Sequence, residues 1–246
     1  MIKKLFDLLK RMLVHRYCAN CGEPMQKDVE ESICDECYEE WIEWMGLECT
    51  SCGKPCGQCE CIPPSIRNVN SLELVKWCAF YDTKRAGNFV RLFYIIKDYY
   101  DEPIVDLFAG RMCAQIVHAC NEAKIDYKKF VITYVPRRSK GYPRGKYDHA
   151  KAIAKAVGKR LGLEVVDALV NISKKQQKRL SKEERLKNAR ESYQLKKNYK
   201  SDKKFYILVD DIITTGASVL ACSKCLKRAG AQFVFPVAFA KTQEHN

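Results

Sequence analysis

Residues 205–218 read FYILVDDIITTGAS and join an apolar run, an acidic pair and a loop of small residues. The first five residues are apolar or aromatic, which predicts a buried strand. Asp210 and Asp211 follow that strand, and a helix is expected after the loop, ending near Gly230. A strand, a short loop and a helix in this order are typical of an α/β fold.

The loop after the acidic pair has the composition of a phosphate-binding site. A helix N-terminus presents unpaired backbone amides to an anion, and small or hydroxylated residues leave these amides accessible. The carboxylates could then accept hydrogen bonds from the 2- and 3-hydroxyls of a ribose. This arrangement fits ribose 5-phosphate or 5-phosphoribosyl 1-pyrophosphate (PRPP), whereas the alternative is an acidic pair that only caps the next helix. The expected phosphate ligands are Thr214, Thr215, Gly216, Ala217 and Ser218.

The chain before this stretch alternates helical and strand patterns. Helices are predicted over residues 83–100, 106–124 and 148–161, and strands over 130–135 and 164–169. Such an alternation predicts a mostly parallel sheet flanked by helices.

Cysteines are concentrated near the N-terminus, where nine of the fourteen lie between Cys18 and Cys61. Eight of them form four C-x2-C pairs, and two pairs sit in a repeated phrase, CANCGEP at 18–24 and CTSCGKP at 49–55. In each phrase the glycine lets the chain turn so that backbone amides approach the sulfur atoms. The repeat predicts two related zinc sites.

A tetrahedral zinc ion is completed by two such pairs. The simplest assignment places one zinc on Cys18, Cys21, Cys34 and Cys37, and a second on Cys49, Cys52, Cys56 and Cys59. An interleaved pairing satisfies the same chemistry, and Cys61 is a credible substitute ligand that ranks below Cys59. The other five cysteines are predicted to be apolar packing residues: Cys78, Cys113, Cys120, Cys222 and Cys225.

The cellular setting is expected to be cytoplasmic. Paired cysteines in a reducing compartment are more often metal ligands than disulfides. No unbroken apolar core of a signal peptide and no transmembrane segment is visible in the sequence. We expect an amphipathic helix over residues 1–17, a zinc-finger module over 18–66 and an α/β domain over 67–246.

The chain carries a formal charge of +13, and the positive charge is concentrated in one stretch. Residues 137–204 hold 22 Lys or Arg against 7 Asp or Glu, a balance of +15. A basic face of this kind attracts nucleic acid, pyrophosphate or an anionic membrane, and the alternative is a well-solvated surface.

These phrases together resemble the ComF family of late competence proteins, which join a zinc finger to a type I phosphoribosyltransferase-like domain. Residues 205–218 resemble the PRPP loop of type I phosphoribosyltransferases. Four further phrases resemble parts of the ComF family: CGQC at 56–59 before Pro63 and Pro64, Tyr81 with Asp82, VPRR at 135–138 with Arg144 and Gly145, and Gln177, Arg179, Leu180 and Ser181 with Arg185 and Asn188. The family usually has Phe-Asn-Gln where this chain has Lys146, Tyr147 and Asp148, so contacts beside the pyrophosphate loop are expected to differ.

The resemblance implies a type I phosphoribosyltransferase-like parallel sheet flanked by helices, with a small N-terminal four-cysteine zinc-finger module. It also implies Mg²⁺-PRPP chemistry, and a role with single-stranded DNA and with DNA-uptake or recombination proteins during natural transformation.

Two functions fit this sequence. In the first, an amidophosphoribosyltransferase-like enzyme holds ribose on Asp210 and Asp211, stabilises pyrophosphate with Arg137, Arg138 and Lys140, and closes residues 174–190 as a lid. In the second, a single-stranded DNA-binding protein uses the basic loops, with Tyr142, Tyr147 and Tyr193 available for base stacking. We expect a DNA-uptake protein that binds both DNA and a ribose phosphate, with turnover left open.

Overall fold

The computed structural model describes residues 16–25, 32–66, 74–82, 89–98, 101–137, 148–173, 192–197, 199 and 205–243. The helix predicted over residues 1–17 lies outside these residues except for its last two. Within the part of the chain that is described, no helix combines the length and the apolar character needed to cross a membrane.

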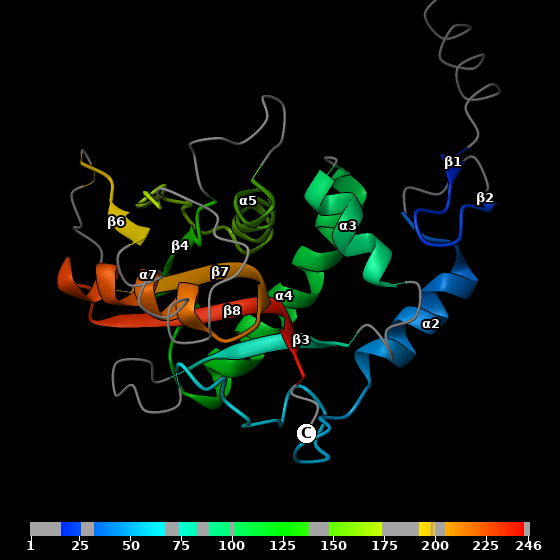
Figure 1. Ribbon diagram of the computed structural model, residues 1–246, viewed down its shortest axis with the longest axis horizontal. Helices are drawn as coiled ribbons and strands as arrows, with labels where there is room; N and C mark the ends of the chain where they lie inside the picture. Colours follow the sequence, from blue (N-terminus) through cyan, green and yellow to red (C-terminus); the bar gives the residue numbers. More distant parts are fainter. Residues whose placement is uncertain are drawn as a thin grey trace, which may run out of the picture.

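A parallel sheet of four strands forms the centre of the fold (Figure 1). The strand order is β3 (Lys76–Tyr81), β8 (Phe233–Thr242), β7 (Phe205–Ile213) and β4 (Val131–Tyr134). Val209 pairs with Tyr134 on one side and with Val237 on the other, so β7 is an inner strand. The predicted strands at 130–135 and from Phe205 are confirmed, and the α/β class with a parallel sheet is confirmed with them.

Strands β3 and β8 were not predicted from the sequence. Strand β8 contains Pro236, which lies opposite Leu208 of β7. Proline has no amide hydrogen and is normally excluded from inner strands, so its presence argues against a strand assignment. The run from Phe233 to Lys241 is nevertheless buried along its whole length, because helices cover both faces of the sheet.

The strand predicted over residues 164–169 is wrong for most of its length. Ile132 donates to Glu164 and accepts from Val166, which gives a single parallel bridge between Ile132 and Val165 beside β4. The chain then leaves the sheet edge and forms β5 (Leu169–Asn171), which pairs antiparallel with β6 (Tyr193–Leu195). The apolar residues are therefore part of a short segment that bridges β4 at one point, and they do not form a fifth long strand.

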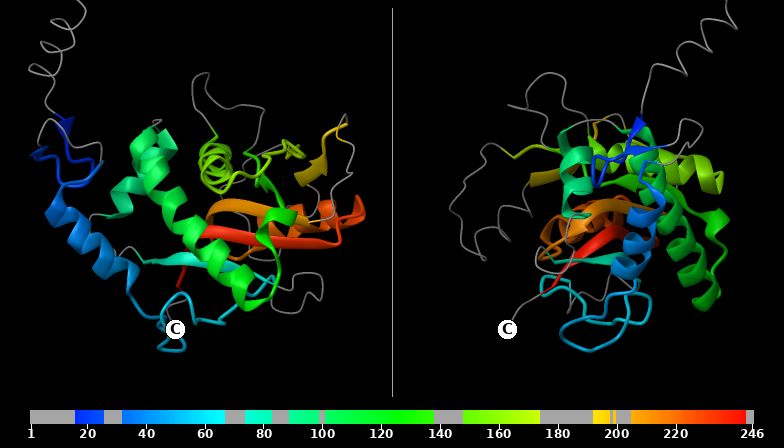
Figure 2. Two further views of the ribbon diagram at one scale, coloured as in Figure 1. Left: turned by 180° about the vertical axis from the view of Figure 1, so that it is seen from behind. Right: turned by 90° about the vertical axis from the view of Figure 1, so that its right-hand side faces the viewer.

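Alternate residues of β7 face two different cores. Ile207 and Val209 pack toward α4 (Glu102–Glu122) and α5 (His149–Leu161), whereas Tyr206 and Leu208 pack toward α7 (Ala217–Arg228). The α4 helix lies behind the sheet in Figure 1 and in front of it in the left view of Figure 2. The sheet is therefore sandwiched between helices, as the sequence predicted.

Side-chain caps fix where the two helices behind the sheet begin. The carboxylate of Asp101 accepts from the amide of Ile104, so α4 starts four residues earlier than predicted. The carboxylate of Asp148 accepts from the amide of Lys151, and α5 ends at Gly162, whose φ is 67°. The predicted helix 148–161 is thus confirmed, and that at 83–100 is confirmed over α3 (Val90–Asp98), within the residues described.

The N-terminal cysteine-rich segment is joined to the main core by a helix that the sequence did not reveal. After the hairpin of β1 (Arg16–Tyr17) and β2 (Pro24–Met25), α2 (Asp35–Met45) buries Trp41 and Trp44. The Trp41 ring stacks 5.7 Å from Phe108 and 5.5 Å from Phe239. The aromatic contacts bring the helix of the cysteine-rich segment into the core that covers the sheet.

Candidate functional site

Asp210 and Asp211 lie inside strand β7 rather than after it. The predicted strand ended at Val209, but the ladder continues with Asp210 opposite Ala238 and Ile212 opposite Ala240. The longer neighbouring strand β8 supplies these partners, which is why β7 extends past the acidic pair. Both residues are buried near the C-terminal end of the sheet, where Asp210 is 8% exposed and Asp211 is 9% exposed.

Burial makes the acidic pair electrostatically costly. Burial, and second the negative charge of Asp211, raise the pKa of Asp210 well above its ordinary value. The backbone amide of Asp211 donates to Asp210 Oδ1 at 3.0 Å and partly opposes this effect on the pKa. A ligand that offers hydroxyl donors to the pair would stabilise its charged form.

The loop from Thr214 to Ser218 turns tightly against residues that follow the cysteine clusters. Gly216 caps α7 with φ of 80°, a conformation that favours glycine. A Cβ atom added there would lie 2.5 Å from Ile66 Cδ1 and 3.3 Å from Pro63 Cβ. Ser65 also donates its amide to Thr215 O at 3.2 Å. Gly216 has no side chain to cap α7, and the first amide of the helix, that of Ala217, donates to the hydroxyl of Thr215 at 3.4 Å.

The loop after β4 meets the acidic pair from the neighbouring strand. Because β4 and β7 are parallel and adjacent, their C-terminal ends lie side by side. Arg137 follows β4, donates its amide to Asp148 Oδ2 at 3.1 Å, and places Nη2 3.1 Å from His149 Nε2. Arg138 and Lys140, predicted to act with Arg137, lie outside the described residues.

His149 is a site residue that the sequence analysis missed. It is buried, with 4% exposed, and its Nε2 lies 2.7 Å from Asp211 Oδ2. His149 occupies the first turn of α5, directly after the capping residue Asp148. The signal available in the sequence was the Asp-His dipeptide at the start of an amphipathic helix that follows a strand, a position at the same sheet edge as the acidic pair.

One predicted stacking residue is placed elsewhere. Tyr193 is buried among the residues between α7 and the sheet, so its ring is not a surface platform for a nucleic-acid base. Burial raises the pKa of its hydroxyl, which hydrogen-bonds Ser218 and Asn171. Tyr193 therefore contacts the first turn of α7 from inside the core. Tyr142, Tyr147 and the predicted lid at 174–190 lie outside the described residues.

The first cysteine group matches the predicted set. The sulfur atoms of Cys18, Cys21, Cys34 and Cys37 lie within 4.8 Å of one another. Burial would raise the pKa of Cys18, but the amides of Cys21 and Cys34 donate to its sulfur and lower its pKa to about 7. A lowered pKa favours the thiolate, which is the form that binds metal.

The second group contains Cys61 in place of Cys56, which corrects the simplest sequence assignment. Its members, Cys49, Cys52, Cys59 and Cys61, again lie within 4.8 Å of one another. Cys56 is not in this group, although it shares a buried apolar cluster with Trp77, Phe80 and the ligands Cys49 and Cys59, and burial raises its pKa to about 12. What separates Cys56 from the four ligands is the position of its sulfur atom, because burial raises the pKa of Cys59 as well.

The repeated phrases adopt the same turn in both groups. Cys18 N donates to Glu23 O at 2.8 Å, and Cys49 N donates to Lys54 O at 2.9 Å. The glycine of each phrase, Gly22 and Gly53, has a positive φ. Burial would raise the pKa of Cys49, but the backbone amides of Ser51 and Cys52 donate to its sulfur and lower that pKa to about 7, as at Cys18. The internal repeat therefore encodes two equivalent turns.

The spacing of the sulfur atoms fits a tetrahedral metal ion. With metal–sulfur bonds near 2.3 Å, the edges of a tetrahedron are about 3.8 Å. Cys21 Sγ lies 3.8 Å from Cys34 Sγ, and Cys52 Sγ lies 3.7 Å from Cys59 Sγ. Both groups could hold a metal ion, consistent with zinc. The predicted packing cysteines Cys78, Cys113, Cys120 and Cys222 are buried, and Cys225 is half-buried and donates to Tyr193 O.

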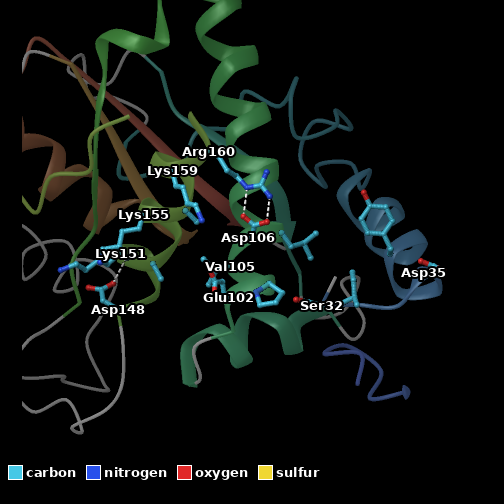
Figure 3. Close-up of a pocket in the computed structure, with 16 residues that line it drawn as sticks. Ser32, Asp35, Glu102, Val105, Asp106, Asp148, Lys151, Lys155, Lys159 and Arg160 are labelled. Carbon is cyan, nitrogen blue, oxygen red and sulfur yellow. Dashed lines mark hydrogen bonds and ion pairs between the residues drawn. The ribbon is translucent and has the colours of Figure 1, made fainter. Parts of the chain in front are cut away.

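A groove of about 1390 Å³ lies between α2, α4 and α5 (Figure 3). Lys151, Lys155 and Lys159 follow one another at four-residue intervals along the α5 side of the groove. The guanidinium of Arg160 pairs with Asp106, and Lys151 pairs with Asp167 at 3.2 Å. Lys155 and Lys159 are exposed, so part of the basic stretch in the sequence forms a row beside this groove.

No model of a known protein family matches the chain, and no curated protein matches it. The structure itself offers three features that bear on function. These are the acidic pair with its loop, the two cysteine groups and the lysine row of α5.

Proposed function

We propose that the protein is a ComF-type protein of DNA uptake. It would bind PRPP or ribose 5-phosphate through a type I phosphoribosyltransferase-like domain, and single-stranded DNA through its basic face. One observation carries the proposal: Asp210 and Asp211 sit near the C-terminal end of an inner parallel strand, which leads through a short loop into a helix capped by Gly216. Ligands of open α/β sheets bind at that end of the strands.

Each part of the pocket has one chemical task in this proposal. The amides and hydroxyls of the loop from Thr214 to Ser218 bind the 5-phosphate. Asp210 and Asp211 accept hydrogen bonds from the ribose hydroxyls. Arg137 binds the pyrophosphate of PRPP, with Arg138 and Lys140 as further ligands, and Mg²⁺ enters as the PRPP complex.

Two zinc ions are proposed as structural cofactors. Sulfur-only coordination by four cysteines is typical of zinc sites that stabilise a fold and leave no position open for substrate. The second site bears on the phosphate pocket, since the segment from Cys61 to Ile66 runs from this site to Gly216. Zinc would thereby hold one wall of the pocket in place.

DNA binding is supported by the lysine row on α5. Lys155 and Lys159 are exposed and belong to a stretch of net charge +15. They lie about two and three turns along α5 from its capping residue Asp148, which is beside the proposed pocket. Cations spaced along one helix face can follow a phosphate backbone, and such binding releases counterions. Affinity for single-stranded DNA should therefore fall steeply as salt increases.

An active amidophosphoribosyltransferase-like enzyme is the second candidate. The observation that favours it is the proximity of Arg137 to the acidic pair, since a cation beside the ribose would stabilise departing pyrophosphate. Release of pyrophosphate from Mg²⁺-PRPP in the presence of a nitrogen acceptor would distinguish this enzyme from a binding protein.

Isothermal titration with Mg²⁺-PRPP tests the proposed pocket. The wild-type protein should bind at one site per chain, and Asp211→Asn should weaken binding at least about tenfold, because a hydrogen bond to a charged group contributes about 1.5–3 kcal/mol. Glu122→Gln, an exposed carboxylate at the end of α4, is the matched control and should bind like wild type. A wild-type protein that gives no heat of binding would refute the proposal.

A further inference from the structure

The ring of His149 stands between the two halves of the proposed pocket. Its Nε2 lies 2.7 Å from Oδ2 of Asp211, on the ribose side, and 3.1 Å from Nη2 of Arg137, on the pyrophosphate side. The two partners come from different strands, β7 and the end of β4, whereas the histidine comes from α5. One ring nitrogen therefore touches both strand ends that form the pocket.

These two partners make opposite demands on Nε2. The Arg137 guanidinium can only donate, so it requires a lone pair on Nε2. The ionised carboxylate of Asp211 can only accept, so it requires an Nε2–H. An imidazole nitrogen has a single in-plane position for a proton or a lone pair, and it can make a good hydrogen bond to one partner at a time.

The other ring nitrogen does not settle the choice. The tautomer of a histidine is normally fixed by the hydrogen bond that its second nitrogen makes. Nδ1 of His149 is buried and has no hydrogen-bond partner among the described residues. Among the residues that the structure describes, Nδ1 is unpaired whether it carries the proton or a lone pair, so the tautomer follows from the partners of Nε2.

We propose that His149 is a positioning residue that couples ribose binding at Asp211 to pyrophosphate binding at Arg137 by exchanging its Nε2 between them. This inference rests on the proposed function. When pyrophosphate binds, it draws the Arg137 guanidinium into charge-assisted hydrogen bonds. The ring then adopts the tautomer with hydrogen on Nε2, which requires water reaching the site on local opening to take the proton from Nδ1 and return one to Nε2, and Nε2–H donates to Asp211 and orients its carboxylate.

The consequence is a positive coupling between two ligands. A correctly oriented Asp211 holds ribose hydroxyls better, so pyrophosphate should favour ribose 5-phosphate binding through His149. Linkage requires the same factor in the opposite direction. The arrangement would favour intact PRPP, which carries both groups, over ribose 5-phosphate alone.

His149→Gln is the decisive variant. The glutamine amide has a separate oxygen, which can accept from Arg137, and a separate nitrogen, which can donate to Asp211. Both contacts can then persist together and the competition disappears, while the pocket keeps its polar groups. His118→Gln, at an exposed histidine paired with Glu122, is the control.

The experiment measures the affinity for ribose 5-phosphate by calorimetry, with and without saturating Mg²⁺-pyrophosphate. The ratio of the two affinities should be about fivefold or more higher in wild type and His118→Gln than in His149→Gln. In parallel, the ring ¹⁵N resonance of His149 Nε2 should move toward the N–H position when pyrophosphate is added, and that of His118 should not.

The outcomes separate the two proposals. If wild type binds both ligands but His149→Gln keeps the wild-type ratio, or the His149 resonance does not move, the coupling is wrong and the pocket assignment stands. If wild type binds neither ligand, the proposed function fails and the coupling fails with it.

Discussion

A Cβ atom on Gly216 would lie 2.5 Å from Cδ1 of Ile66, so the loop before α7 is packed directly against the chain that leaves the second cysteine group. This segment after the second cysteine group is also bound to β8, because Lys241 donates to the carbonyl of Cys61. Lys241 itself is held over the Trp77 ring at 4.5 Å. The loop before α7 and the second cysteine group are thus parts of one packed unit.

Gly216→Ala should therefore damage both stability and ligand binding. A positive φ disfavours alanine by about 1–2 kcal/mol, and the clash with Ile66 adds about 1–3 kcal/mol of overpacking. Gly230→Ala is the matched control, because Gly230 also has a positive φ but a Cβ there meets nothing within 4 Å. Urea denaturation should show a larger loss for Gly216→Ala. Equal losses for both variants would contradict the packing argument.

The two cysteines that differ between the sequence assignment and the structure give a clear metal prediction. Cys61→Ser should lower bound zinc from about two ions per chain to about one, because serine is a poor zinc ligand. Cys56→Ser should keep about two ions, since Cys56 packs against Trp77 and Phe80. Elemental analysis of the purified proteins measures this. The reverse pattern would restore Cys56 as the ligand.

The lysine row makes a prediction about salt. Each lysine that contacts a phosphate of single-stranded DNA contributes about 0.7 to the slope of log affinity against log salt. The double variant Lys155→Gln, Lys159→Gln should reduce that slope by about 1.4 and leave Mg²⁺-PRPP affinity unchanged. Lys128→Gln with Lys129→Gln, before β4, serves as control. A slope that stays at the wild-type value would exclude this face as the DNA contact.

The raised pKa of Asp210 predicts a pH dependence of stability. A carboxyl whose pKa is raised by folding stabilises the protein at low pH, and this contribution is lost as pH rises above 3.8 and through the folded pKa. The Asp210→Asn variant does not lose this contribution. The difference between its free energy of unfolding and that of wild type should therefore increase, in favour of the variant, by about 1.4 kcal/mol for each pH unit as pH rises toward the folded pKa. Urea denaturation between about pH 4 and 7 measures the difference.

Asp167 supplies a control of opposite sign. Burial would raise its pKa, but hydrogen bonds from Lys196, Tyr134 and Lys151 outweigh it and lower the pKa. The ionised Asp167 carboxylate therefore adds to the free energy of unfolding above pH 3.8, and this contribution is lost as pH falls through the folded pKa. Asp167→Asn should therefore lose stability relative to wild type at neutral pH. Parallel pH profiles for the two variants would contradict the assigned directions.

Local chemistry was readable in the sequence wherever one segment determined it. The caps Asp148 and Gly162 bounded α5 correctly, and the repeated cysteine phrase predicted two identical turns. The apolar run from Phe205 correctly marked an inner strand, although only pairing with β8 could show that it continues past the acids.

The features that were missed depend on contacts between distant segments. Cys61 takes the place of Cys56 because the fold brings the Cys61 sulfur within 4.8 Å of those of Cys49, Cys52 and Cys59, which spacing alone does not determine. His149 reaches Asp211 only because α5 packs against the face of the sheet that contains β7. No periodicity or spacing encodes such contacts.

The proposed function stands on one binding mode, in which the loop from Thr214 to Ser218 holds a sugar phosphate while Asp210 and Asp211 hold its ribose. A crystal structure with ribose 5-phosphate would show this binding mode. We expect the phosphate at the N-terminus of α7 and the two ring hydroxyls on the carboxylates. A ligand bound elsewhere, or a loop that remains empty at saturating concentration, would show that the binding mode is wrong.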